Sequence, residues 1–127
     1  MKAGIATAVA LVGALASDGT MAANGVLRTG NDFITPCKDF ISEGGLTPDQ
    51  SFDAGICAGV IKGVRMSLFY LGITTPQMST ACIPASITDG QITRIFLKFL
   101  DNYPEQLHSD ATVLLITSLK AAYPCKE

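Results

Sequence analysis

Four cysteines carry the chemistry that is easiest to assign in this sequence. Cys37, Cys57, Cys82 and Cys125 lie at least 20 positions apart, without any C-x-x-C pair, and His108 is the single histidine. Compact zinc sites take cysteines and histidines at short spacings, so no metal centre is expected. An even number of widely spaced cysteines in a short chain with an export signal predicts two disulfide bonds, formed in an oxidising compartment.

The positions of the cysteines relative to the expected helices rank the three possible pairings. Cys37 and Cys57 lie on either side of a turn near Thr47, so antiparallel packing of the two helices would bring them level. Cys82 stands just before the next helix and Cys125 just after the last one, so the same packing would bring these two together. We expect Cys37–Cys57 and Cys82–Cys125, each worth roughly 3 to 4 kcal/mol on the chain-entropy model. The other two connectivities stay open.

The remaining reactive side chains do not form a catalytic set. His108 precedes Ser109 and Asp110, which are the residue types of a nucleophilic triad, but side chains at adjacent positions point apart. We interpret His108 as an exposed loop histidine in front of a helix cap. No Gly-rich phosphate loop occurs. The sequence therefore predicts no catalytic residues, no cofactor, no metal and no enzyme activity.

The charge distribution argues against one large class of partner. Nine basic and eleven acidic residues give a net charge of −2, and neither sign forms a run. Nucleic-acid-binding domains carry a basic patch or stripe. No nucleic-acid partner is therefore expected.

Residues 1–23 predict a cleavable signal peptide. Lys2 precedes an apolar run over residues 3–16, and small residues follow up to Ala23. The run is shorter than the roughly 20 residues that cross a bilayer as a helix. We expect cleavage after Ala23, which leaves residues 24–127 as one exported domain without a membrane span. Cleavage after Ala16 and an uncleaved anchor are the alternatives.

Apolar residues three or four positions apart predict helices throughout the exported domain. The expected helices cover about residues 31–42, 47–71, 88–103 and 109–123. Two capping boxes, over residues 47–50 and 88–91, mark helix starts. No strand-like alternation holds for more than a few residues. The expected fold is a small all-α domain of four to five helices with two disulfides.

Gly55, Gly59 and Gly63 repeat every four residues on the second expected helix. A glycine inside a helix costs about 1 kcal/mol relative to alanine, so the repeat calls for a reason. We expect a neighbouring helix to approach this bare face closely. A functional surface is the alternative.

An uncharged stretch follows this helix. Residues 72–81 lack helical periodicity and contain Pro76, which predicts a loop. Met66, Phe69 and Tyr70 come just before it, and with the loop they form an apolar surface patch if they are not packed in the core. Such patches mark interaction sites. Packing of the two rings inside the domain is the alternative.

Several short motifs occur in order over about residues 28–125. They are Gly30-Asn31, Cys57-Ala58-Gly59-Val60-Ile61-Lys62-Gly63, Cys82-Ile83-Pro84 with Thr88 and Gln91, Tyr103-Pro104, and Tyr123-Pro124-Cys125. Together with the four-cysteine frame, this order resembles the Rap/Tai family of type VI secretion immunity proteins. The resemblance implies a small helical periplasmic protein, often a homodimer, that neutralises a peptidoglycan amidase effector by placing a loop into the enzyme's active-site cleft.

Length and composition select the loop over residues 72–81 as the candidate for contact with the amidase, and the turn over residues 44–50 comes second. The residues predicted to bind the partner are Thr74, Thr75, Pro76, Gln77 and Met78. A non-immunity periplasmic module that binds another envelope protein or a small apolar ligand is the alternative function. The uncharged loop and the last helix, which is apolar on two sides, motivate it.

Overall fold

The computed structural model describes residues 28–126, and this part of the chain is all-helical. It contains four α-helices and two short 3-10 helices: α2 (Gly30–Phe40), α3 (Pro48–Thr74), η1 (Pro76–Met78), α4 (Asp89–Asn102), η2 (Pro104–Gln106) and α5 (Ala111–Ala122). Within residues 28–126 the one β-type contact is an isolated bridge between Thr29 and Asp110. The all-α prediction is confirmed. The predicted signal peptide, residues 1–23, lies outside the described residues.

The helices begin where side chains satisfy the free N–H groups of the first turn. The two predicted capping boxes are present, with Thr47 and Thr88 each paired to the glutamine three residues later. A third box starts α2, where the Asp32 carboxylate accepts from the Thr29 N–H at 2.9 Å and from its hydroxyl at 3.1 Å. These hydrogen bonds, the backbone one first, lower the pKa of Asp32.

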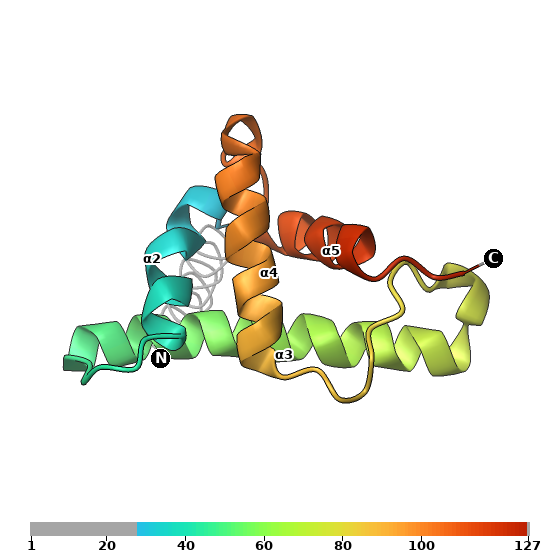
Figure 1. The fold of residues 1–127 in the computed structure, drawn as a ribbon, viewed down its shortest axis with the longest axis horizontal. Helices are drawn as coiled ribbons and strands as arrows, with labels where there is room; N and C mark the ends of the chain where they lie inside the picture. Colours follow the sequence, from blue (N-terminus) through green and yellow to red (C-terminus); the bar gives the residue numbers. More distant parts are fainter. Residues whose placement is uncertain (1–27, 127) are drawn as a thin grey trace, which may run out of the picture.

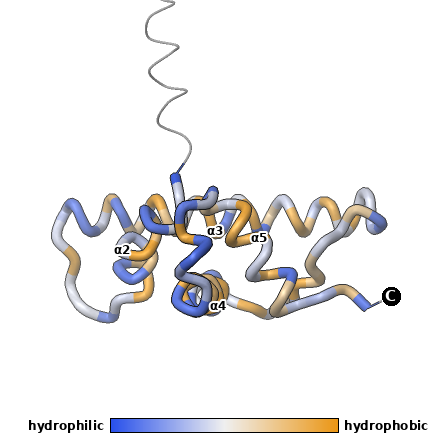
Figure 2. The backbone as a smooth tube through the Cα atoms, turned by 90° about the horizontal axis from the view of Figure 1, so that it is seen from above, coloured by the Kyte–Doolittle hydropathy of each residue, from blue (hydrophilic) through white to orange (hydrophobic). Residues whose placement is uncertain are grey.

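Helix α3 is the longest element, and each of the four α-helices contacts the other three. Helix α4 crosses α3 steeply, so it stands upright in Figure 1 and is seen nearly end-on in Figure 2. The core lies where the predicted apolar faces of the helices meet. Its most deeply buried apolar side chains are Cys37, Cys57, Ile61, Ile92, Phe96, Leu100, Leu115 and Leu119.

Both predicted disulfides are confirmed. Cys37 on α2 is bonded to Cys57 on α3, and Cys82 is bonded to Cys125. The first bond is fully buried in the contact between α2 and α3. The second joins the segment before α4 to the residues after α5. A backbone hydrogen bond of 2.8 Å from the Cys82 N–H to the Tyr123 carbonyl joins the same two segments.

The prediction of a close helix neighbour at Gly55, Gly59 and Gly63 is wrong. A Cβ atom added at any of these positions would meet nothing within 4 Å. The core-facing residues of helix α3 include Cys57, Ile61, Val64 and Leu68. The three glycines occupy other positions around the helix and are exposed. The glycine stripe is therefore open surface.

The close backbone approach occurs instead at Gly30, the first residue of α2. A Cβ there would lie 2.7 Å from Leu114 Cδ1, 3.1 Å from Leu100 Cδ2 and 3.3 Å from the Leu107 carbonyl oxygen. The Gly30 N–H donates to the Ser109 carbonyl at 3.0 Å. This contact brings the start of α2 against the connection that leads into α5.

Among the residues that the structure describes, α3 is the one helix long and apolar enough to cross a membrane by length and composition. It carries Asp53, Lys62 and Arg65, which are costly in a bilayer, and Cys57 bonds it to α2. The residues that α3 contributes to the core are Ala54, Cys57, Ile61, Val64 and Leu68. Only 17% of its most apolar window is buried, so much of its apolar surface is uncovered.

Candidate partner-binding site

Residues 72–74 are helical, so the predicted loop over residues 72–81 is shorter than expected. Helix α3 ends at Thr74, and its C-cap Thr75 comes immediately before Pro76. The proline explains this end point, because the residue before a proline is disfavoured in helical conformation. The uncharged composition that predicted a loop is equally compatible with one more turn of helix.

The predicted contact residues form an ordered turn at the end of α3. The Thr75 N–H donates to the Leu71 carbonyl at 2.9 Å, and the Thr74 hydroxyl donates to the Tyr70 carbonyl at 2.8 Å. Pro76, Gln77 and Met78 then make the single turn η1. The turn therefore presents its side chains on a backbone held by its own hydrogen bonds.

This end of the molecule is rich in exposed apolar side chains. Phe69, Ile73 and Met78 are 56%, 61% and 63% exposed, and Tyr70 is exposed beside them. The Phe69 and Tyr70 rings contact each other edge to face, with centroids 6.2 Å apart. The alternative of core packing for these rings is thus wrong. We call Phe69, Tyr70, Ile73 and residues 74–78 the η1 end.

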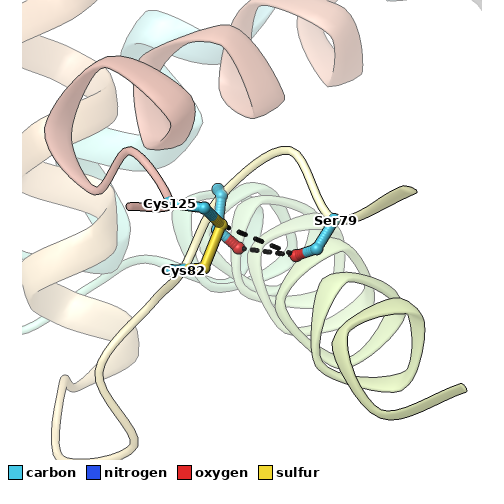
Figure 3. The surroundings of a disulfide bond; sticks show 4 residues. Ser79, Cys82 and Cys125 are labelled. Atoms are coloured by element: carbon cyan, nitrogen blue, oxygen red, sulfur yellow. Dashed lines mark hydrogen bonds between the residues drawn. A yellow bond between two sulfur atoms is a disulfide. The ribbon is translucent and has the colours of Figure 1, made fainter. Parts of the chain in front are cut away.

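The Cys82–Cys125 bond anchors the segment that leaves the η1 end. Figure 3 shows the Ser79 hydroxyl next to this disulfide, where it lies 3.9 Å from Cys125 Sγ and donates to the Ala81 carbonyl at 3.2 Å. The η1 end and the C-terminal residues accordingly lie at the same end of the molecule (Figure 1). Helix α3 holds the turn of the η1 end on its N-terminal side, and the Cys82–Cys125 disulfide holds the chain on its C-terminal side.

The second candidate for partner contact, residues 44–50, lies at the opposite end of α3 (Figure 1). It connects α2 to α3, and Gly44 and Gly45 are exposed. Its polar groups satisfy the helix start, since the Thr47 N–H donates to Gln50 Oε1 at 2.9 Å. This turn has no exposed large apolar side chain comparable to those of the η1 end.

The residues that could carry catalysis are used in helix caps or lie apart. His108 is exposed, and Asp110 accepts from the Val113 N–H at 3.0 Å as the N-cap of α5. Asp89, in the first turn of α4, pairs with Arg65 at 2.7 Å. Across residues 28–126, no three His, Cys, Asp or Glu side chains are grouped so that they could hold a metal ion.

A groove beside the η1 end was not predicted from the sequence. It lies between the second half of α3 and residues 79–85. The signal that could have indicated it is the pair Lys62 and Arg65, two cations about one turn apart in the otherwise uncharged stretch of α3 over residues 54–74. Their position at a cavity depends on the path of residues 79–85, which helical periodicity does not predict.

The fold and the η1 end together define a small disulfide-bonded helical protein with exposed apolar side chains gathered at one end, and such patches mark interaction sites. The chain belongs to the family of Rap1a immunity proteins, whose family model matches residues 29–125. Comparison with curated proteins and with solved structures found no match. The resemblance to Rap/Tai immunity proteins is confirmed at the level of the family.

Proposed function

We propose that this protein is a periplasmic, non-enzymatic immunity protein that binds a type VI secreted peptidoglycan amidase and blocks its active-site cleft with the η1 end. The observation that carries the proposal is the family match over residues 29–125. Immunity proteins of this kind act by binding a cognate effector. The amidase as target and the cleft as binding site extend that general role to this chain.

The geometry of the η1 end supports its assignment as the contact surface. Binding energy at protein interfaces concentrates in a few large apolar and aromatic anchors, and Phe69, Ile73 and Met78 are exposed together at this end. The hydrogen-bonded turn of residues 74–78 loses little conformational freedom on binding, which favours affinity. A blocking element must also resist displacement, and the Cys82–Cys125 bond tethers its far side.

The periplasm is the compartment that fits the cysteines and the effector. All four cysteines are paired in the two disulfides, and disulfides persist in oxidising compartments such as the periplasm. Peptidoglycan lies in the same compartment, so the amidase would meet its inhibitor there. The predicted signal peptide over residues 1–23 supplies the export route.

We also propose that the protein forms a homodimer, as the family resemblance implies. The uncovered face of α3, with Phe52 exposed, offers apolar surface for a second copy. Light scattering of the purified protein should give twice the mass of one chain. A monomer mass at micromolar concentration would contradict the dimer and leave the inhibitory role unaffected.

Titration of an amidase tests the function. The probe is a purified type VI secreted peptidoglycan amidase of the organism that produces this protein, and the readout is the release of soluble fragments from isolated peptidoglycan. We expect activity to disappear when one chain has been added per enzyme molecule, because each chain carries one η1 end. Undiminished activity at a severalfold excess of this protein would overturn the proposal.

A further inference from the structure

The groove beside the η1 end has the size and lining of a small-molecule site. Its volume is about 520 Å³, within the roughly 300–1,000 Å³ typical of ligand pockets. Leu68 and Ala81 line it as buried side chains, and Met66, Phe69 and Ile73 line it as exposed ones. We call this cavity the α3 groove.

The α3 groove is held open by the path of residues 79–85. Their backbone is fastened to the residues after α5 by the Cys82–Cys125 bond and by the hydrogen bond from the Cys82 N–H to the Tyr123 carbonyl. Pro84 is followed by a turn in which the Ile87 N–H donates to the Pro84 carbonyl at 3.2 Å. These bonds fix the path of the segment relative to the end of α5, so one wall of the groove is covalently anchored. A ligand would therefore enter a site that already exists.

Charge distinguishes one side of the α3 groove. Its charged lining residues are Lys62 and Arg65, and both are cations. Arg65 is neutralised by Asp89 at 2.7 Å and also donates to the Ala85 carbonyl at 3.4 Å. Lys62 is exposed and takes part in no ion pair within residues 28–126. The groove thus combines a large apolar surface with one uncompensated positive charge.

We propose that the α3 groove binds a long-chain fatty carboxylate, with the acyl chain against Met66, Phe69 and Ile73 and the carboxylate at Lys62. An alkyl chain gains about 0.8 kcal/mol for each methylene group that it buries, so the apolar lining provides affinity. The unpaired ammonium selects an anionic head group. The proposal does not rest on the immunity role, because the site and its ligand require no effector.

Binding of a fluorescent fatty acid tests the proposal. The probe is an undecanoic acid with a dansyl group at the far end of its chain, titrated into the purified, disulfide-bonded protein. We expect enhanced fluorescence that saturates at one probe per chain and is reversed by palmitate. The methyl ester of the same probe has no charge and should bind about fivefold more weakly, as expected for the loss of one partly exposed ion pair.

Two variants and a matched control locate the probe. Lys62→Glu should weaken the acid about fivefold or more and leave the ester unchanged, because it removes the only uncompensated cation of the groove. Lys98→Glu, the same charge change at an exposed position of α4 outside the groove, is the matched control. Gly72→Leu places a branched side chain in the groove, where a Cβ would meet only Ser79 Oγ at 3.9 Å, and should abolish binding of both probes.

The variants also define how the proposal fails. Equal affinity for acid and ester, or an effect of Lys98→Glu as large as that of Lys62→Glu, would contradict the anionic head group. Unsaturable binding, or full binding to Gly72→Leu, would place the probe on the exposed apolar surface and overturn the site itself. Circular dichroism of Gly72→Leu confirms that the variant is folded.

Discussion

Gly30 leaves no room for a side chain, since a Cβ would approach Leu114 to 2.7 Å and the Leu107 carbonyl oxygen to 3.3 Å. A backbone oxygen cannot rotate away as a side chain does. Overpacking of a core usually costs about 1–3 kcal/mol of stability. Alanine has a better helix propensity than glycine, by about 1 kcal/mol, and this gain offsets part of the overpacking cost in a Gly30→Ala variant. Gly30 is part of the first motif of the resemblance, and its steric role explains why a glycine stands there.

Gly30→Ala should therefore lower the free energy of unfolding by about 1 kcal/mol, measured by denaturant titration. Gly45→Ala is the matched control, because no atom lies within 4 Å of its Cβ position and no glycine of the described chain has a positive φ. We expect Gly45→Ala to be neutral or to stabilise by about 0.4–1 kcal/mol through the unfolded state. Equal effects of the two substitutions would refute the steric role of Gly30.

At the scale of elements, the capping boxes and the apolar periods predicted the helices well. Thr47 with Gln50 and Thr88 with Gln91 satisfy local N–H groups, so their effect does not depend on the rest of the fold. The end of α3 was predicted less well, because Gly72 and Thr74 are compatible with both helix and loop. The Gly55–Gly59–Gly63 stripe was assigned to the wrong environment, since sequence spacing shows which residues share a face and not what covers that face.

The segment of residues 79–88 is the element that depends most on one covalent bond. On the chain-entropy model, the Cys82–Cys125 bond, with a sequence separation of 43, contributes about 4 kcal/mol. In the double variant Cys82→Ser with Cys125→Ser, we expect faster exchange of the amide at position 82, which donates to the Tyr123 carbonyl, and loss of the α3 groove. The amides of helix α2 should stay protected from hydrogen exchange, because the separate Cys37–Cys57 disulfide joins α2 to α3.

The buried Cys37–Cys57 bond provides the control for that experiment. Its removal as Cys37→Ala with Cys57→Ala should raise amide hydrogen exchange in α2 and leave the amide of Cys82 protected, because the bond lies in the contact between α2 and α3. If both double variants loosened the same segments, the two disulfides would not act on separate parts of the domain.

At the scale of the whole molecule, the pairing of the two disulfides is the feature of the helix arrangement that could be predicted from the sequence. The pairing was predictable because Cys37 and Cys57 flank one turn symmetrically, and because Cys82 and Cys125 bracket the last two helices. The α3 groove was not predictable, since it depends on how residues 79–85 cross α3. The expected contact residues Thr74–Met78 do lie together on the surface, and the apolar neighbours Phe69 and Ile73 extend them into a larger exposed apolar surface.

The most direct test of the proposed function compares two substitutions in the amidase inhibition assay. Met78→Glu places a charge in the η1 end, and Val113→Glu places the same charge on α5 at a residue of similar exposure, 57% against 63% for Met78. We predict that Met78→Glu raises the inhibition constant at least about 30-fold, as for loss of an interface hot spot, and that Val113→Glu leaves it unchanged. Inhibition by Met78→Glu at wild-type strength would contradict the assignment of the η1 end as the element that blocks the enzyme.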